Sequence, residues 1–221
     1  MQFIYAKNAG EKEIILDSKQ YHHIFNVRRL RAKIGDIFSF ANLVENNIYR
    51  YKLVESSGKK ANFTLQDIIL KPQQSPKTHI IQAVIDDFDK ILPFLNELFV
   101  KKVSLFYADF SQKNIKINME RLDSILINSS MQCGRLSKME IEIFNNLNEV
   151  LEVYNDALVL DFCENNENLA NFCRFIIGSE GGFSQRERDL FKKRKMCVSG
   201  INHPLILRSQ TASIFIASKN I

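Results

Sequence analysis

The sequence offers few residues for metal, disulfide or membrane chemistry. Its four cysteines, Cys133, Cys163, Cys173 and Cys197, include no C-x-x-C pair, and no histidine lies at metal-ligand spacing from another candidate ligand. We therefore expect reduced, buried thiols in a cytoplasmic protein, and no metal site. No apolar run is long enough to cross a bilayer, and residues 1–10 lack the apolar core and cleavage site of a signal peptide, so no membrane partner is expected.

Glycine is also scarce, and its distribution is informative. Three of the eight glycines, Gly178, Gly181 and Gly182, belong to the segment 177–184. An apolar run ends there in residues that let the backbone turn sharply and let a ligand approach main-chain N–H groups. Ser184 and Glu187 then form the capping box of a helix. The segment is neither G-x-G-x-x-G nor a P-loop, so it does not indicate a nicotinamide or P-loop nucleotide site.

Residues 205–212 repeat this arrangement, because an apolar run again leads through small residues into a helix. Either loop alone could be a simple turn that starts a helix. Two strand-loop-helix units close together, however, are typical of the place where an α/β protein with a doubly wound sheet binds a small ligand. The pair therefore predicts a ligand site near the C-terminus.

The first seventy residues differ from the rest of the chain. Short β-like runs punctuated by turns at residues 35–36 and 56–58 predict a small β-barrel in residues 1–70, with one short helix at 22–30. Residues 71–77 contain two of the four prolines and are typical of an interdomain linker. The predicted barrel strands are 14–16, 37–40, 49–54 and 63–65.

Residues 78–221 alternate strand-like and helix-like segments. This alternation predicts an α/β domain with a parallel sheet covered on both faces. Ligands of such sheets bind beyond the carboxyl ends of the strands, where the two loops are expected. The predicted strands are 79–85, 103–108, 141–144, 157–163 and 172–177, and the predicted helices are 90–99, 118–132, 184–195 and 209–219.

The net charge of +5 is compatible with a nucleic-acid partner but does not require one. In the helix at 22–30 we expect Ile24, Val27 and Leu30 to point inward. Four basic residues, Arg28, Arg29, Arg31 and Lys33, would then stay outside, either as a solvated face or as contacts to RNA phosphates.

Two further basic positions lie at predicted helix ends. Gly134 is well placed as a helix C-cap, so Arg135 is either a solvated charge near the helix end or a clamp for phosphate or carboxylate. Residues 192–195 form a run of Lys and Arg that we expect to complement the dipole of the preceding helix.

These segments, in this order, resemble the RsmE family, SPOUT-class methyltransferases that methylate N3 of a uridine in 16S ribosomal RNA. The likeness covers nearly the whole chain. Three positions depart from the family pattern: Ser179 replaces a proline, Gln210 replaces a glutamate, and residues 202–203 replace Leu-Gly. The matching motifs are H-x-x-x-V-x-R at His22 or His23, Val27, Arg28 and Arg29, G-D at Gly35 and Asp36, Q-x-G-R at Gln132, Gly134 and Arg135, I-G-P-E-G-G-F-S at 177–184, and I-L-R-x-E-T-A at 206–212.

The resemblance implies an N-terminal PUA-like barrel that helps to hold RNA and a C-terminal SPOUT domain, 78–221, tied in a trefoil knot. It also implies a homodimer, the small ribosomal subunit as substrate, and S-adenosylmethionine as methyl donor. The residues expected to bind the donor are Leu160, Phe162, Ile177, Gly178, Ser179, Glu180, Gly181, Gly182, Leu205, Ile206, Leu207 and Ser209.

Methylation at N3 requires loss of the N3 proton and stabilisation of the resulting anion. Arg208 and Arg135 are the candidates for a positive charge or a phosphate clamp, and Glu180 is a candidate base that could instead cap main-chain N–H groups. The RNA-binding candidates are Arg28, Arg29, Arg31, Lys33 and Arg135. Two alternatives stay open: a non-catalytic RNA-binding protein on the same fold, and a SPOUT enzyme that acts on a ribose 2′-hydroxyl or on transfer RNA.

Overall fold

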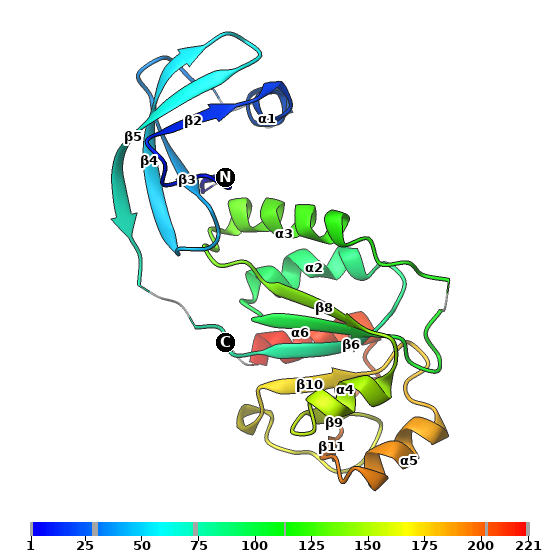
Figure 1. Ribbon diagram of the computed structural model, residues 1–221. Coiled ribbons are helices and arrows are strands. Elements are labelled where there is room, and N and C mark those ends of the chain that lie inside the picture. The colour runs from blue at the N-terminus through cyan, green and yellow to red at the C-terminus, as the bar shows by residue number, and fades with distance from the viewer. Residues whose placement is uncertain (1, 28–30, 73–74, 113, 202, 220–221) are drawn as a thin grey trace. The chain divides into compact units, whose positions relative to one another are not determined.

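The computed structural model describes residues 2–27, 31–72, 75–112, 114–201 and 203–219. The chain divides into two compact units, Met1–Gln74 with Ile127–Lys138, and Ser75–Leu126 with Met139–Ile221. The sequence-based division at residues 71–77 does not anticipate that Ile127–Lys138 packs with the N-terminal unit. Figure 1 labels most of the elements of both units.

The N-terminal unit is built on a curled, mixed five-stranded sheet in the order β1-β3-β4-β5-β2. Only β1 and β3 pair in parallel, and irregular register between β4 and β5 follows Arg50 and Leu53. The aromatic rings of Phe40, Tyr51 and Phe63 pack edge-to-face within its core. The strands are β1 (Ile4–Tyr5), β2 (Glu13–Leu16), β3 (Ile37–Ala41), β4 (Asn47–Ser56) and β5 (Ala61–Leu70).

The helix predicted at 22–30 begins earlier and has a different geometry. Asp17 caps α1 (Ser18–Tyr21), and the chain continues as the π-helix η1 (His22–Val27). Ile24 is buried as predicted, but the prediction that Val27 points inward is wrong, because its side chain is 59% exposed. The wider π-helical turn separates residues that an α-helix would place on one face. Leu30, Arg28 and Arg29 lie outside the described residues.

The C-terminal unit contains a six-stranded, all-parallel sheet in the order β11-β9-β10-β6-β7-β8. The five strands predicted in this region are confirmed, with bounds that differ by one to three residues at their ends. The sixth, β11 (Val198–Ser199), has only two residues and leaves no periodic pattern in the sequence. The others are β6 (His79–Ala83), β7 (Lys102–Phe106), β8 (Glu140–Phe144), β9 (Leu158–Leu160) and β10 (Arg174–Ile177).

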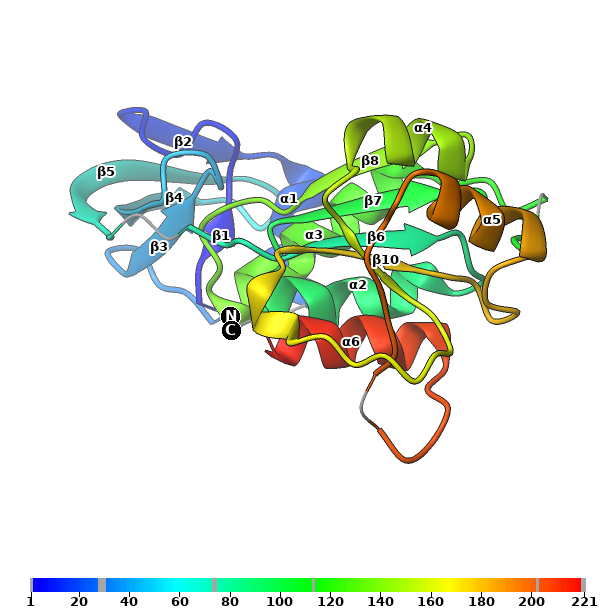
Figure 2. The same cartoon turned by 90° about the horizontal axis from the view of Figure 1, so that it is seen from below.

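Helices cover both faces of this sheet, as Figure 2 shows for α2 and α6 on one side and α4 and α5 on the other. Ile80 and Ile81 are consecutive on β6 and enter opposite core clusters, because side chains alternate along a strand. The prediction of a parallel sheet with two buried faces is therefore confirmed. The helices are α2 (Phe88–Glu97), α3 (Met119–Cys133), α4 (Leu147–Val153), the short 3₁₀ helix η2 (Leu169–Asn171), α5 (Gln185–Lys193) and α6 (Ser209–Lys219).

The cysteines are not buried as the sequence led us to expect. Cys133, Cys163 and Cys173 are exposed, Cys197 is half-buried, and no two of the four are joined by a disulfide. Cys163 lies beyond the end of β9, and Cys173 precedes β10, so both fall just outside the apolar runs that suggested burial. No helix among the described residues combines the length and the apolar character that a membrane span requires.

Candidate active site

A pocket of about 350 Å³ opens at the carboxyl ends of β9 and β10. This is the edge of the parallel sheet where the two predicted loops were expected to meet. Its lining comes from three segments of the C-terminal unit: residues 160–163, residues 177–183 without Gly181, and the described residues of 200–212 without Gln210 and Thr211.

The first loop, residues 178–182, folds back on itself. The Gly182 N–H donates to the Ser179 carbonyl at 2.9 Å, and Gly182 has a φ of +69°, which favours glycine. A Cβ at Gly178 would lie 3.0 Å from the Gly182 carbonyl carbon. The loop therefore needs glycine at both positions, and its tight turn leaves main-chain groups next to the pocket.

The two loops are tied together beneath the pocket by Gln82, which lies on β6 and is fully buried. Its Nε2 donates to Ser209 Oγ at 2.7 Å and to the Gly178 carbonyl at 3.3 Å. Ser209 Oγ also donates to the Gly178 carbonyl, and Ser213 Oγ donates to Gln82 Oε1. The Ser209 hydroxyl is therefore engaged in joining the loops, a role that the sequence did not indicate for either residue.

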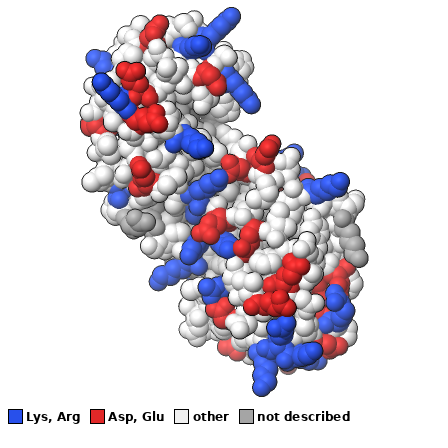
Figure 3. Space-filling view, in the orientation of Figure 1, with Lys and Arg blue, Asp and Glu red and all other residues white. Residues whose placement is uncertain are grey.

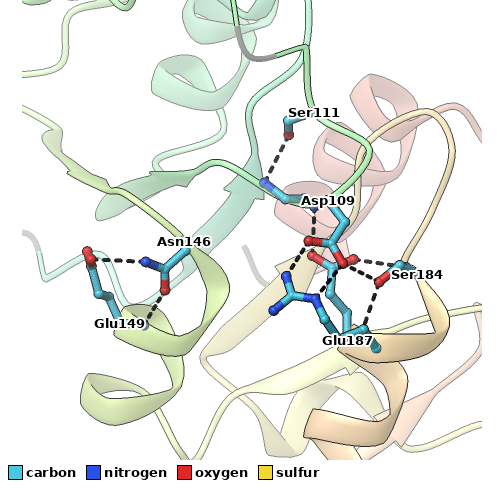
Figure 4. Close-up of polar contacts among 8 residues, drawn as sticks. Asp109, Ser111, Asn146, Glu149, Ser184 and Glu187 are labelled. Carbon is cyan, nitrogen blue, oxygen red and sulfur yellow. Dashed lines mark hydrogen bonds and ion pairs between the residues drawn. The ribbon is translucent and has the colours of Figure 1, made fainter.

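The N-terminus of α5, which follows the glycine loop, is fixed by contacts with Asp109. Ser184 and Glu187 form the predicted capping box, and Glu187 Oε1 also accepts from the Asp109 N–H at 3.0 Å. Asp109 in turn accepts from Ser184 Oγ and binds Arg186. Figure 4 shows Asp109, Ser184 and Glu187 pointing toward one another, with Ser111 and the Asn146–Glu149 cap nearby in the same view. These contacts hold the loop between β10 and α5 in place.

Eleven of the twelve residues predicted to bind the donor line the pocket. The exception is Gly181, where a Cβ would lie 3.2 Å from the Phe110 ring. Six further lining residues were not named as donor-binding by the sequence analysis. Phe183 and Ala212 lie within the matched motifs, and Gly200, Ile201, His203 and Pro204 lie between them. Asp161 and Cys163 belong to the strand end where donor binding was expected.

The candidate catalytic side chains Arg208 and Glu180 both belong to this lining. Arg208 is exposed and forms no ion pair with another described residue. Glu180 is also exposed, and its Oε1 accepts a hydrogen bond from Gln210 Nε2 at 3.1 Å. The pocket therefore presents an unpaired cation and an anchored carboxylate.

Arg135 belongs to the other compact unit. It is 5% exposed, and its Nε donates to the Ser137 carbonyl at 2.8 Å. Burial lowers the pKa of its guanidinium to about 10. The interpretation of Arg135 as a solvated charge is therefore wrong, and its part in binding phosphate or carboxylate stays a prediction.

The predicted basic cluster of the N-terminal unit is described only in part. Arg31 and Lys33 are exposed, and the Lys33 N–H donates to Asp36 Oδ2 at 2.8 Å across the Gly35–Asp36 turn. Residues 192–195 are exposed at the end of α5, where they complement the helix dipole as predicted. Figure 3 shows Lys and Arg gathering at the lower end of the view, where Figure 1 places α5. No group of His, Cys, Asp and Glu that could hold a metal occurs in the described part of the chain.

Comparison with known proteins identifies relatives over the full length. The sequence profile of a family described as RNA methyltransferase domain matches residues 72–220. Ribosomal RNA small subunit methyltransferase E of Helicobacter pylori is 41% identical, over 99% of this chain and 98% of that protein. Ribosomal RNA small subunit methyltransferase E 2 of Borreliella burgdorferi is 28% identical, over 94% of this chain and 90% of that protein.

Solved structures share the fold at lower sequence identity. A methyltransferase of Legionella pneumophila, solved with bound S-adenosylmethionine, is 20% identical with a TM-score of 0.81, and the match covers 99% of this chain and 97% of that one. Ribosomal RNA small subunit methyltransferase E of Neisseria gonorrhoeae, also bound to S-adenosylmethionine, is 18% identical with a TM-score of 0.81, over 99% and 96% of the two chains. The likeness thus extends through both compact units.

Proposed function

Because the chain belongs to the RsmE family of RNA methyltransferases, we propose that it transfers the methyl group of S-adenosylmethionine to N3 of a uridine in 16S ribosomal RNA. The small ribosomal subunit, partly assembled, is the substrate, because N3 lies on the Watson–Crick edge and must be unpaired to react. The observation that carries this proposal is the pocket formed by the two C-terminal loops at the carboxyl edge of the sheet.

The pocket has suitable size and chemistry for the methyl donor. Its volume falls within the range of about 300–1,000 Å³ that is usual for small-ligand sites. Leu160, Ile177 and Leu207 supply apolar walls, and the glycine loop supplies main-chain groups. Ser179 Oγ is buried and has no hydrogen-bond partner among the described residues, which leaves a polar atom for a ligand. When bound, S-adenosylmethionine supplies a methyl group already activated by its sulfonium.

The protein has two remaining tasks, to align the uracil and to manage charge at its N3. Alignment within the pocket supplies much of the rate enhancement. Arg208, with no competing carboxylate among the described residues, stabilises the uracil anion through its positive charge. Glu180 accepts the N3 proton. This division of roles assigns charge stabilisation to the second loop and proton removal to the first.

RNA is held by the N-terminal unit as well. We assign its strands to a PUA-like barrel in residues 1–70, joined by the linker 71–77 to a SPOUT domain, 78–221, that contains a trefoil knot and forms a homodimer. Arg31, Lys33 and Arg135 are the described candidates for RNA contacts, and Arg28 and Arg29 complete the set in sequence. An enzyme with this substrate acts in the cytoplasm, where ribosomes are assembled.

Reverse transcription of ribosomal RNA tests the proposal. An N3-methylated uridine cannot pair normally, so the reverse transcriptase stops at one position in RNA from the parent strain. We expect this stop to vanish in a deletion strain and to return when the gene is restored. A stop present in all three strains would refute N3 methylation by this protein.

Two further measurements separate the alternatives. Calorimetric titration with S-adenosylmethionine is expected to show binding, whereas no binding would favour a non-catalytic RNA-binding protein, an alternative motivated by the departures at Ser179, His203 and Gln210. Mass analysis of nucleosides from the deletion strain separates N3 methylation of ribosomal RNA from methylation of a 2′-hydroxyl or of transfer RNA. Loss of a 2′-O-methylated nucleoside, or of a methylated transfer RNA, would favour a different SPOUT reaction.

A further inference from the structure

Gln210 lies in the first turn of α6, and its side chain reaches the glycine loop. Its Nε2 donates to Glu180 Oε1 at 3.1 Å, a contact between residues that are thirty positions apart. The opposite orientation of the amide would place its oxygen against the carboxylate, so the donor role of Nε2 follows from electrostatics. The contact joins the second loop to the carboxylate of the first.

The other end of this amide has no partner. Gln210 Oε1 is buried and accepts no hydrogen bond from any described residue. A buried acceptor left unpaired costs about 1–3 kcal/mol, so such atoms are rare unless a ligand completes them. An entering N–H group would satisfy Gln210 Oε1. The methyl donor carries such N–H groups in its amino groups, and the uridine carries one, its N3–H, until that proton is transferred.

We propose that Gln210 is a positioning residue that holds Glu180 in place to take the proton from N3 of the target uracil. This inference rests on the proposed function. With Oε1 of Glu180 fixed by the amide, Oε2 is left to receive the proton. The N3 electron pair then forms the bond to the methyl carbon as the carbon–sulfur bond breaks, and the electron pair of that bond stays on sulfur. Glu180 later releases its proton to water.

The chemistry of glutamine suits this task. An amide donates without carrying a charge, so it orients Glu180 and does not compete with it for the proton. A glutamate at position 210 could orient Glu180 in the same way only while it is protonated, because two ionised carboxylates at this separation repel each other. The two side chains would therefore differ in how they respond to pH.

The test measures methylation of small subunits isolated from the deletion strain, by wild-type protein and by the variants Gln210→Met, Gln210→Glu, Glu180→Gln and the double variant Glu180→Gln/Gln210→Met. Methionine has the length of glutamine but cannot donate. We expect Gln210→Met to lower kcat about tenfold, with the Kd for S-adenosylmethionine unchanged within twofold. A donor Kd that rises by as much as kcat falls would place the missing N–H on the methyl donor and overturn the role in proton transfer.

Two readouts separate positioning from a structural role. The double variant is expected to be no slower than Glu180→Gln alone, because Gln210 acts only through that carboxylate. The rate of Gln210→Glu relative to wild type is expected to fall as the pH rises, because a second ionised carboxylate at position 210 would repel Glu180 and no longer orient it. Effects that multiply in the double variant, or a ratio that stays flat with pH, would refute the proposal.

A matched control lies outside the pocket. Gln185 Nε2 donates to Asp189 Oδ1 at 2.9 Å on the exposed face of α5, a glutamine–carboxylate pair of the same kind. Gln185→Met is expected to leave kcat unchanged. If wild-type protein does not methylate the subunits, the proposed function fails. If wild type is active and Gln210→Met equals it, only the assignment of Gln210 fails.

Discussion

The two edges of the parallel sheet carry similar polar residues, which differ in whether they have hydrogen-bond and ion-pair partners. At the carboxyl edge, Ser179 Oγ and Gln210 Oε1 are buried without a partner among the described residues, and Arg208 forms no ion pair with any of these residues. At the amino edge, Lys102, Glu142 and Tyr154 bind one another, with Lys102 Nζ 2.7 Å from Glu142 Oε2 and the Tyr154 hydroxyl 2.6 Å from Glu142 Oε1. The polar groups of the carboxyl edge therefore lack hydrogen-bond or ion-pair partners among the described residues, whereas those of the amino edge have them.

The amino edge also contains a serine and a histidine. His79 Nε2 lies 2.6 Å from Ser104 Oγ, which donates to Glu142 Oε1 at 2.5 Å. Because the serine proton is engaged by the glutamate, Nε2 of the histidine carries a proton and donates to the serine. Serine, histidine and carboxylate occur together here in an order that activates no nucleophile, because the serine donates to the glutamate and accepts from the histidine. A polar cluster indicates a ligand site where its hydrogen bonds are missing, and a structural role where they are complete.

The pKa values at the amino edge reflect the burial and the hydrogen bonds of this cluster. Burial lowers the pKa of His79 to about 4, and the neighbouring Lys102 acts in the same direction. Burial alone would raise the pKa of Glu142, but hydrogen bonds from Lys102, Ser104 and Tyr154 outweigh it and lower the pKa. The cluster therefore stabilises a neutral histidine beside an ionised glutamate.

Removal of the unpaired cation should have the largest effect. We expect Arg208→Ala to lower kcat about 10²- to 10³-fold, as for loss of one group that stabilises a developing negative charge. The free energy of unfolding should change by less than about 0.5 kcal/mol, because Arg208 is exposed and unpaired among the described residues. Methylation kinetics and urea unfolding check both parts. Arg174→Ala at the amino edge, which breaks an exposed pair with Asp156, is the control and should keep full activity.

Acid should weaken the amino edge. The pKa of His79 is 6.5 when unfolded and about 4 when folded, so the unfolded chain binds the extra proton between these values. The stabilisation is complete above about pH 6.5 and is lost as the pH falls toward 4, by about 3 kcal/mol at most. Urea unfolding at several pH values measures this loss. In His79→Gln, which can still donate to Ser104, the loss over this window should shrink, and an unchanged loss would assign it to other groups.

The sequence predicted the carboxyl edge better than the amino edge, and the reason is physical. Glycines, caps and apolar runs are local signals, so the two loops and the strands that carry them were visible. Gln82 looked like one polar residue in an apolar strand, because its partners Gly178 and Ser209 lie 96 and 127 positions away. The cluster around Glu142 was missed for the same reason, since its members come from β6, β7, β8 and the end of α4, which are far apart in the sequence.

The N-terminal unit shows a second limit of local signals. Periodicity identified the long strands of this unit. Residues 127–138 also belong to it, and this depends on the packing of Met131 and Leu136 with Phe3 and Leu43. The burial of Arg135 follows from that packing, so neither the sequence motif nor the helix C-cap could reveal it.

Neutralising Glu142 should destabilise the fold and spare the chemistry. Glu142→Gln leaves Lys102 without its ion pair, and the half-buried position limits the expected cost to about 2 kcal/mol. The rate per folded molecule should equal that of wild type, because the cluster lies at the edge opposite the pocket. Unfolding and kinetics on the same preparation test this, and a fall in kcat with intact folding would show that the two edges are coupled.

The smallest expected effect concerns the packing of the pocket wall. A Cβ at Gly200 would lie 2.4 Å from the Cys163 carbonyl oxygen, so Gly200→Ala must push apart two main-chain segments that both line the pocket. We expect the Kd for S-adenosylmethionine to rise about tenfold, which corresponds to about 1.4 kcal/mol, while the pH dependence set by His79 stays as in wild type. Calorimetric titration and urea unfolding measure the two quantities. If donor affinity were unchanged and only the free energy of unfolding fell, Gly200 would have a purely structural role, like the polar residues of the amino edge. The difference between the two edges would then hold for their side chains and not for their main-chain packing.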